Sequence, residues 1–219
     1  PMPPFHLLES LLWTPGEGYV LRAEHLRRLA DSGEYFGYPV DLVEVERRLD
    51  ALAAGLSEAG KVRLLVGPRG EVQAEARPLA EGAQPEPLRV GLATAAVDSG
   101  DVWLYHKTTR RAAYDAARAA RPDCDEVLLW NERGELTEAT TSNLVLELDG
   151  RLWTPPVSAG LLAGTLRARL LAEGTIAERT LTPDDLARAE RVWLINSVRG
   201  RRAGQIQSDD PQIRQIRQI

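Results

Sequence analysis

The segment 78–87 most constrains the architecture, because it interrupts the middle of the chain with residues that neither helices nor strands accommodate. Its turn-forming residues are Pro78, Gly82, Pro85 and Pro87, and it shows no hydrophobic period. Proline removes a backbone donor and fixes φ, and glycine weakens both kinds of element. We therefore interpret residues 80–87 as a linker between two domains of a 219-residue chain. Two domains joined in this way offer a cleft for a small ligand.

Residues 1–79 have the pattern of a small α+β domain. Short apolar runs bounded by turn residues predict strands, and apolar residues at spacings of three and four predict amphipathic helices. A Gly-Pro-Arg-Gly sequence predicts the turn of a hairpin. The expected strands span 5–13, 19–22, 61–66 and 71–77, and the expected helices span 24–35 and 41–58.

Residues 88–205 predict a larger domain in which strands and helices are mixed. Thr182 and Pro183 form a helix start, with threonine as the N-cap and proline in the first turn. The tail 206–219 repeats a three-residue pattern and is either a short helix or a disordered segment. The expected strands are 88–96, 125–130, 143–148, 151–153, 176–181 and 192–196, and the other expected helices are 108–120 and 165–173.

Composition excludes several classes of function. The net charge is −5 and the pI is about 5.4, whereas nucleic-acid-binding domains are usually basic. The single cysteine, Cys124, permits neither an intrachain disulfide nor a Cys-x-x-Cys metal site, and it precedes an apolar run that suits a buried thiol. Three histidines without metal-like spacing predict no metal centre. The chain contains no membrane span or signal-peptide core, so we expect a cytoplasmic protein.

Three strings carry the chemistry. Lys107 follows the run Trp103-Leu104-Tyr105 and precedes an alanine-rich helix, a setting in which a partly desolvated amine can lose its proton near neutral pH. Glu138 enters an apolar strand, and Gly164-Thr165 opens a helix. A lysine for an aldehyde, a carboxylate for a pyridinium and a helix N-terminus for a phosphate are the three needs of pyridoxal 5′-phosphate, PLP.

In these strings the sequence resembles the fold type IV PLP family, which includes branched-chain and D-amino-acid aminotransferases and 4-amino-4-deoxychorismate lyase. The resemblance extends from about residue 5 to residue 201. It implies a two-domain D-amino-acid aminotransferase-like fold of mixed α+β and α/β class, PLP as cofactor, and a homodimer. Within the family, the sequence is most similar to the lyase branch, of the type fused to aminodeoxychorismate synthase.

The resemblance also implies roles for individual residues. Lys107 forms the Schiff base with PLP and moves the proton at the substrate Cα. Glu138 pairs with the pyridine nitrogen and keeps it protonated, so that the ring can accept electrons. The start of the helix holds the phosphate through Gly164, Thr165 and Leu166.

Five further contacts follow from the resemblance. In the string His25-Leu26-Arg27-Arg28-Leu29, the arginine before the last leucine contacts the phosphate, which selects Arg28 and leaves Arg27 on the surface. Tyr114, two helical turns after Lys107, lies against the phenolic oxygen of the cofactor. The turn after the last expected strand places Ser197 and Val198 at the phosphate, and Arg199 either holds a substrate carboxylate or is a solvent-exposed arginine.

The expected partner is a small amino substrate, and neither a nucleic acid nor a membrane is expected. The favoured activity is that of 4-amino-4-deoxychorismate lyase, which eliminates pyruvate and leaves 4-aminobenzoate, a folate precursor. The alternative within the same chemistry is a transaminase acting on branched-chain, D-amino acid or (R)-amine substrates. A third alternative is a catalytically silent PLP-binding protein.

Overall fold

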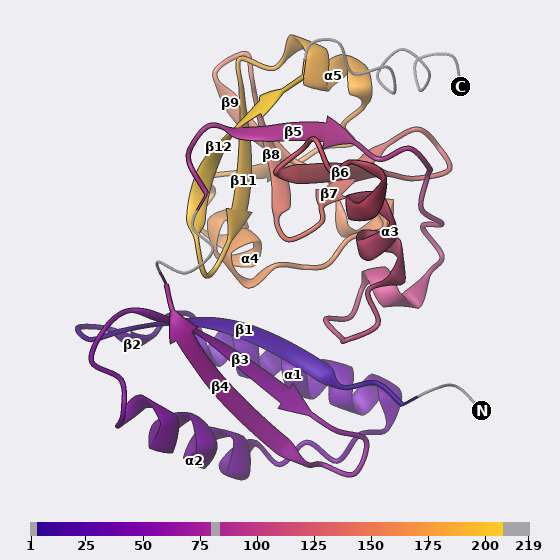
Figure 1. Cartoon of the computed structure of the whole chain (residues 1–219). Helices are drawn as coiled ribbons and strands as arrows, with labels where there is room; N and C mark the ends of the chain where they lie inside the picture. Colours follow the sequence, from indigo (N-terminus) through magenta and orange to yellow (C-terminus); the bar gives the residue numbers. More distant parts are fainter. Residues whose placement is uncertain (1–3, 80–83, 208–219) are drawn as a thin grey trace. The chain divides into compact units, whose positions relative to one another are not determined.

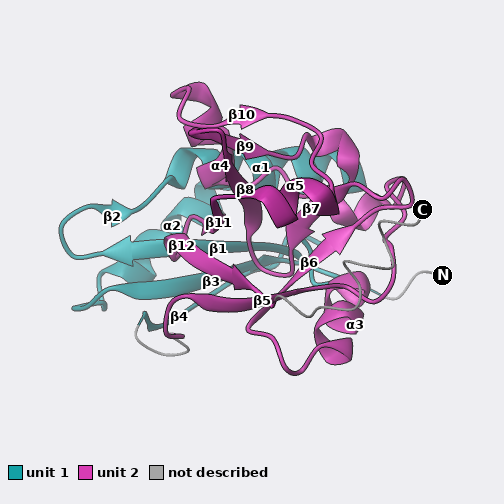
Figure 2. Cartoon of the chain, turned by 90° about the horizontal axis from the view of Figure 1, so that it is seen from above, with its two compact units in different colours: residues 1–83, 106–110 teal, residues 84–105, 111–219 magenta. Residues whose placement is uncertain are grey.

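A computed structural model describes residues 4–79 and 84–207 (Figure 1). The chain forms two compact units (Figure 2). Unit 1 comprises residues 1–83 and 106–110, and unit 2 comprises residues 84–105 and 111–219. The segment 106–110 was expected within the second domain, and its membership of unit 1 corrects that expectation.

Unit 1 contains a four-stranded antiparallel sheet in the order β2-β1-β3-β4. Along β3, buried residues alternate with exposed ones, so one face of this strand is packed and the other is open. The strands are β1 (Leu7–Thr14), β2 (Gly18–Tyr19), β3 (Gly60–Val66) and β4 (Val72–Pro78).

Two helices pack against this sheet, α1 (Arg22–Phe36) on β1 and α2 (Leu42–Ala53) on β4. Asp41 caps α2 by accepting hydrogen bonds from two amides of its first turn. Gly37 ends α1 in the left-handed conformation at φ 69°, which glycine adopts without a steric cost. The strand expected over 19–22 is shorter, because Leu21 has φ 55° and the helix begins at the next residue.

The segment 106–110 belongs to unit 1 because it pairs with the start of β1. The amide of Leu8 donates to the carbonyl of Lys107 at 3.0 Å, and the amide of Thr109 donates to the carbonyl of His6 at 2.9 Å. Leu7 and Thr108 form an isolated antiparallel bridge. The extended backbone explains why the helix expected from residue 108 begins only at Ala112.

Unit 2 contains an eight-stranded sheet in the order β10-β9-β8-β11-β12-β5-β6-β7. An additional pairing of β7 with β8 closes six of the described strands into a ring, from which β9 and β10 extend. The strands are β5 (Leu88–Leu92), β6 (Glu126–Trp130), β7 (Leu136–Ala139), β8 (Asn143–Leu148), β9 (Arg151–Thr154), β10 (Ala177–Glu178), β11 (Arg191–Asn196) and β12 (Gly200–Ile206).

Sequence patterns miss two of these strands. All four residues of β7 are buried, so it lacks the alternation that marks a half-exposed strand. The sequence of β12 is polar and contains two glycines, and its strand conformation comes from pairing with β5 and β11. The strands expected over 88–96 and 176–181 are shorter than predicted.

The helices of unit 2 are short, and the start of the last one was predicted correctly. Thr182 and Asp185 form a capping box at its N-terminus, with Pro183 in the first turn. The α-helices are α3 (Ala112–Ala120), α4 (Thr165–Ala172) and α5 (Pro183–Arg188), and the 3-10 helices are Val102–Leu104 and Val157–Ala159.

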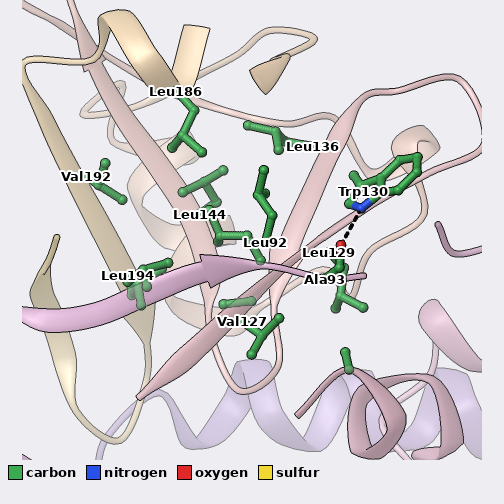
Figure 3. Close-up of a cluster of buried hydrophobic side chains, with 14 of the residues drawn as sticks. Leu92, Ala93, Val127, Leu129, Trp130, Leu136, Leu144, Leu186, Val192 and Leu194 are labelled. Atoms are coloured by element: carbon green, nitrogen blue, oxygen red, sulfur yellow. Dashed lines mark hydrogen bonds between the residues drawn. The ribbon is translucent and has the colours of Figure 1, made fainter. Parts of the chain in front are cut away.

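The core of unit 2 lies among the strands of the ring (Figure 3). Aliphatic side chains such as Leu92, Leu144 and Leu194 are almost completely buried. The indole nitrogen of Trp130 donates to the carbonyl of Ala93 at 2.9 Å, so its polar group is satisfied inside an apolar cluster. Cys124 is a buried free thiol in the same cluster, as expected from the sequence.

The structure describes only parts of the expected linker and tail. Residues 80–83 of the linker and 208–219 of the tail lie outside them. Within the described part of the linker, the carboxylate of Glu86 accepts a hydrogen bond from the amide of Ala203 in β12. Among residues 4–79 and 84–207, no helix combines the length and the apolarity that crossing a membrane requires.

Helix α2 provides a test of the packing in unit 1. Leu49 is 0% exposed and Val43 is 76% exposed on the same helix. We expect Leu49→Ala to lower the free energy of unfolding by about 2–5 kcal/mol, because it leaves a cavity. Val43→Ala should change it by less than about 0.5 kcal/mol. Urea denaturation of both variants measures the difference, and equal losses would contradict the described packing of α2.

Candidate active site

Glu138 lies at the point where the ring of strands closes. It is 4% exposed in β7, and its cross-strand neighbour is Asn143 in β8. The turn between the two strands is tight, with the amide of Ala139 donating to the carbonyl of Ser142 at 2.8 Å. The backbone therefore fixes the position of a buried carboxylate.

The carboxylate of Glu138 accepts hydrogen bonds from a phenol, a backbone amide and a side-chain amide. The Tyr114 hydroxyl and the Leu162 amide reach Oε1 at 2.7 and 3.0 Å, and Nδ2 of Asn143 reaches Oε2 at 3.2 Å. An ionised carboxylate only accepts hydrogen bonds, and donors around it favour the charged form. The site can therefore hold a buried negative charge opposite a cationic ring nitrogen.

Tyr114 supports this arrangement from α3. Burial, followed by the charge and hydrogen bond of Glu138, raises the pKa of Tyr114, so the phenol stays protonated and donates. The guanidinium of Arg111 lies 4.5 Å from the centre of its ring. The sequence analysis assigned Tyr114 to the phenolic oxygen of a cofactor, whereas in the structure its hydroxyl donates to Glu138.

The N-terminus of α4 has the features of an anion site. Its N-cap is Gly164, no side chain caps its first turn, and that turn contains no acidic residue. By contrast, side chains cap α2 and α5, and acidic residues lie in the first turn of both helices. Thr165 is buried, and Leu166 packs against a small apolar cluster. Backbone amides at such a helix start favour a phosphate.

The turn 197–199 joins β11 to β12 and is organised by Asn196. Its Oδ1 accepts hydrogen bonds from the amides of Val198 and Arg199 at 3.0 and 2.8 Å. Its Nδ2 donates to the carbonyl of Thr141 at 3.2 Å, which connects the turn to the loop after Glu138. The amide of Val198, expected at a phosphate, thus has a partner within the turn, and the side chains of Ser197 and Arg199 are half-buried.

Unit 1 contains a second buried charge cluster. Glu9 of β1 accepts two hydrogen bonds from Arg28, at 2.8 and 2.7 Å, and its carboxylate lies 2.6 Å from Nδ1 of His25. Burial alone would raise the pKa of Glu9, but the charge and hydrogen bonds of Arg28, with those of His25, lower it to about 2. Arg28 is therefore held in one orientation, while Arg27 is exposed on α1, as predicted.

Lys107 is half-buried on the segment that pairs with β1. The neighbouring His106 lies against α1, where Oγ of Ser32 is 2.9 Å from its Nδ1. The ring of Tyr35 lies 4.4 Å from the ring of His106, between centroids, at a tilt of 31°. Burial lowers the pKa of His106, which favours the neutral ring. Backbone pairing and side-chain contacts together define the course of the chain at Lys107.

The predicted site residues thus divide between the two units. Unit 1 carries Lys107 and Arg28, and unit 2 carries Tyr114, Glu138, Gly164, Thr165, Leu166, Ser197, Val198 and Arg199. Within unit 2, the structure links Glu138 to Tyr114 and to the loop before α4. Among the described residues, no group of histidine, cysteine and carboxylate side chains could hold a metal ion.

Sequence reasoning missed the roles of Glu9, Asn143 and Asn196. Glu9 had a detectable signal, because a lone acidic residue inside an apolar strand needs a buried partner. The two asparagines carried no comparable signal. Their partners include backbone groups of loops far away in the sequence.

The lowered pKa of Glu9 predicts a pH-dependent stability. The depressed value means that ionised Glu9 stabilises the fold above pH 4.5 and that this contribution disappears as the pH falls towards 2. The shift corresponds to about 3 kcal/mol. We expect Glu9→Gln to destabilise the protein at pH 7 and to flatten the acid limb of the stability profile, measured by chemical denaturation.

Glu44 provides the matched control. Hydrogen bonds from Arg47 and Arg48 also lower its pKa to about 2, but it lies on the surface of α2. Surface ion pairs contribute little, so Glu44→Gln should change stability far less than Glu9→Gln. Equal effects of the two substitutions would refute the buried cluster.

Comparison with known proteins shows which family this chain is similar to. The sequence pattern of the family described as "Amino-transferase class IV" matches residues 6–204. A protein named "Putative aminodeoxychorismate lyase" from Schizosaccharomyces pombe is 31% identical over 203 residues, covering 89% of this chain and 86% of the relative.

Solved structures agree with this assignment. A "Putative amino-acid aminotransferase" from Mesorhizobium loti is 36% identical with a TM-score of 0.87, covering 93% of this chain and 100% of that chain. The 4-amino-4-deoxychorismate lyase from Pseudomonas aeruginosa is 26% identical with a TM-score of 0.79, covering 97% and 88%. The type IV fold expected from the sequence is thereby confirmed. This chain belongs to the class IV aminotransferase family, whose members are PLP-dependent enzymes.

Proposed function

We propose that this protein is a 4-amino-4-deoxychorismate lyase, which releases pyruvate and 4-aminobenzoate. The observation that carries the proposal is the buried Glu138 carboxylate, held by hydrogen-bond donors from three segments, in a chain that is similar to proteins named as this lyase. An anion held in this way suits the protonated ring nitrogen of PLP. The uncapped start of α4 suits the phosphate of the same cofactor.

The residues take the following roles in this proposal. When bound, PLP supplies an electron-accepting ring that stabilises negative charge at the substrate Cα. The Lys107 amine holds the cofactor aldehyde and later removes the Cα proton. Glu138 keeps the proton on the ring nitrogen, and Arg199 binds a substrate carboxylate. The phosphate is held by Arg28, Ser197 and the start of α4 at Gly164, Thr165 and Leu166.

A transaminase is the second candidate, and the similarity to the Mesorhizobium loti aminotransferase favours it. Both reactions begin when Lys107 removes the Cα proton. They differ in how the resulting negative charge is used and in the product that is released. A lyase would then expel pyruvate, whereas a transaminase would return the proton through Lys107 and release a keto acid. The deciding test is to incubate the PLP-loaded protein with 4-amino-4-deoxychorismate and, separately, with amino donors and keto acids.

Formation of 4-aminobenzoate and pyruvate at a catalytic rate is the expected result. Keto-acid formation without 4-aminobenzoate would replace the lyase by the transaminase. A cofactor absorbance band with neither product would indicate a PLP-binding protein without turnover.

Lysine chemistry gives a sharp test, because the chain contains only two lysines, Lys61 and Lys107. Lys61 is exposed in β3 and serves as the matched control. We expect Lys107→Ala to lose the visible band of bound PLP and nearly all turnover, and Lys61→Ala to keep both. Borohydride reduction followed by peptide mass spectrometry should place the cofactor mass on Lys107. Label on Lys61 alone would refute the assignment.

The phosphate contacts predict an order of PLP affinities. Arg28→Ala removes a charge-assisted contact and should weaken PLP binding about ten- to hundredfold. Thr165→Val removes one neutral hydroxyl and should weaken it about fivefold. Arg27→Ala, on the exposed side of α1, should bind PLP normally. Titration of apo-protein with PLP measures all three variants.

Stability must be followed alongside, because Arg28→Ala also deprives the buried Glu9 carboxylate of its ion pair. The titrations are therefore made at a temperature at which circular dichroism shows each variant to be folded. A larger loss of affinity in Arg27→Ala than in Arg28→Ala would overturn the assignment on this helix.

Two wider features complete the proposal. We expect a homodimer, as the resemblance to the type IV enzymes implies, and light scattering of the active protein measures it. A fully active monomer would contradict this expectation. We also propose that the chain corresponds to the lyase type that is fused to aminodeoxychorismate synthase, which rests on sequence resemblance alone.

A further inference from the structure

We propose that Asn143 is a positioning residue that couples the pyridinium partner Glu138 to the phosphate-binding turn before α4. The proposal rests on the proposed binding of PLP and extends it to a residue that does not itself need to touch the cofactor. PLP is a rigid ring with its nitrogen and phosphate at fixed positions. A site that binds both ends strongly must hold its two anchors at a fixed spacing.

The hydrogen bonds of Asn143 provide such a connection. The two hydrogens of its Nδ2 are donated to Oε2 of Glu138 at 3.2 Å and to the carbonyl of Leu162 at 2.9 Å. The amide of Leu162 in turn donates to Oε1 of Glu138 at 3.0 Å. The carboxylate, the amide side chain and the loop before α4 therefore form one closed set of contacts. Asn143 is 6% exposed, so water cannot readily replace them.

Gly164 points to the same coupling from the other side. Its φ of −63° and ψ of 142° are open to any residue, so backbone conformation does not require glycine here. A Cβ at Gly164 would instead clash with Oδ1 of Asn143. Asn143 could move aside only by breaking its bonds to Glu138 and Leu162. We therefore infer that the N-cap of α4 is a glycine because the side chain of Asn143 lies against it.

Asn131 offers a matched control within the same unit. It is 0% exposed, and its Nδ2 donates to the carboxylate of Glu135 at 2.8 Å and to the carbonyl of Ala159 at 2.9 Å. Like Asn143, it thus joins a glutamate to the loop that leads to α4. Glu135, however, has no role in the proposed site. Asn131→Ala should therefore cost stability without changing cofactor binding.

The experiment compares PLP titrations of wild type, Asn143→Ala, Asn131→Ala and Glu138→Gln, with urea denaturation of each apo-protein. We expect Asn143→Ala to bind PLP about tenfold more weakly than Asn131→Ala does. The absorbance maximum of its bound cofactor and its kcat should shift in the direction seen for Glu138→Gln. Equal PLP affinities and unshifted spectra in the two asparagine variants would overturn the proposal. A wild type that binds no PLP would overturn the proposed function as well.

A double-mutant cycle of Gly164 and Asn143 distinguishes two effects of a methyl group at Gly164: displacement of Asn143, and direct obstruction of the phosphate. Its first substitution, Gly164→Ala, removes no buried hydrogen-bond donor. Gly164→Ala should weaken PLP binding by displacing Asn143. Once Asn143 is alanine, Gly164→Ala should cost little more, so the two losses are not additive. Fully additive losses would mean that the added methyl group acts on the phosphate itself, and the coupling through Asn143 would be rejected.

Discussion

The cross-strand pair of Glu138 and Asn143 is the constraint on which unit 2 depends. It is the register pair through which β7 meets β8, and this pairing closes the ring of strands. A charged residue at that point needs donors, since an unsolvated carboxylate would destabilise the fold by several kcal/mol. Tyr114, Asn143 and the Leu162 amide supply them. The same contacts that make closure possible hold the anion that the proposed function requires.

Two of the buried carboxylates, Glu9 and Glu138, show how environment separates structure from chemistry. Glu9 lies against a permanent cation, Arg28, which lowers its pKa and makes it part of an internal ion pair. Glu138 is held by a phenol, an amide side chain and a backbone amide, and the phenol stays neutral because its pKa is raised. Neutral donors stabilise a negative charge without neutralising it. In the proposed function, this charge faces the protonated ring nitrogen of the cofactor.

Much of this architecture could be predicted from local pattern. Most strands and helices were expected near their observed positions, and the start of α5 followed from the Thr-Pro signal. Errors arose where pairing overrides pattern. The strand β7 is buried on both sides, β12 is polar, and the chain near Lys107 is extended because it pairs with β1. A polar strand or a buried strand gives no alternation, so periodicity cannot find it.

The sequence by itself predicted the family, through a resemblance that the comparisons confirmed. It also proposed Lys107, Glu138 and the glycine-threonine start of α4 as site residues, because an amine, a carboxylate and a helix N-terminus suit the three reactive parts of PLP. Only the tertiary structure decided what surrounds them. Tyr114 and the Leu162 amide each lie 24 residues from Glu138, on opposite sides of it along the chain. A backbone amide has no signature in a sequence, and an asparagine reveals its partners only when distant strands and loops meet. The donors, unlike the carboxylate, therefore had to be read from the folded chain.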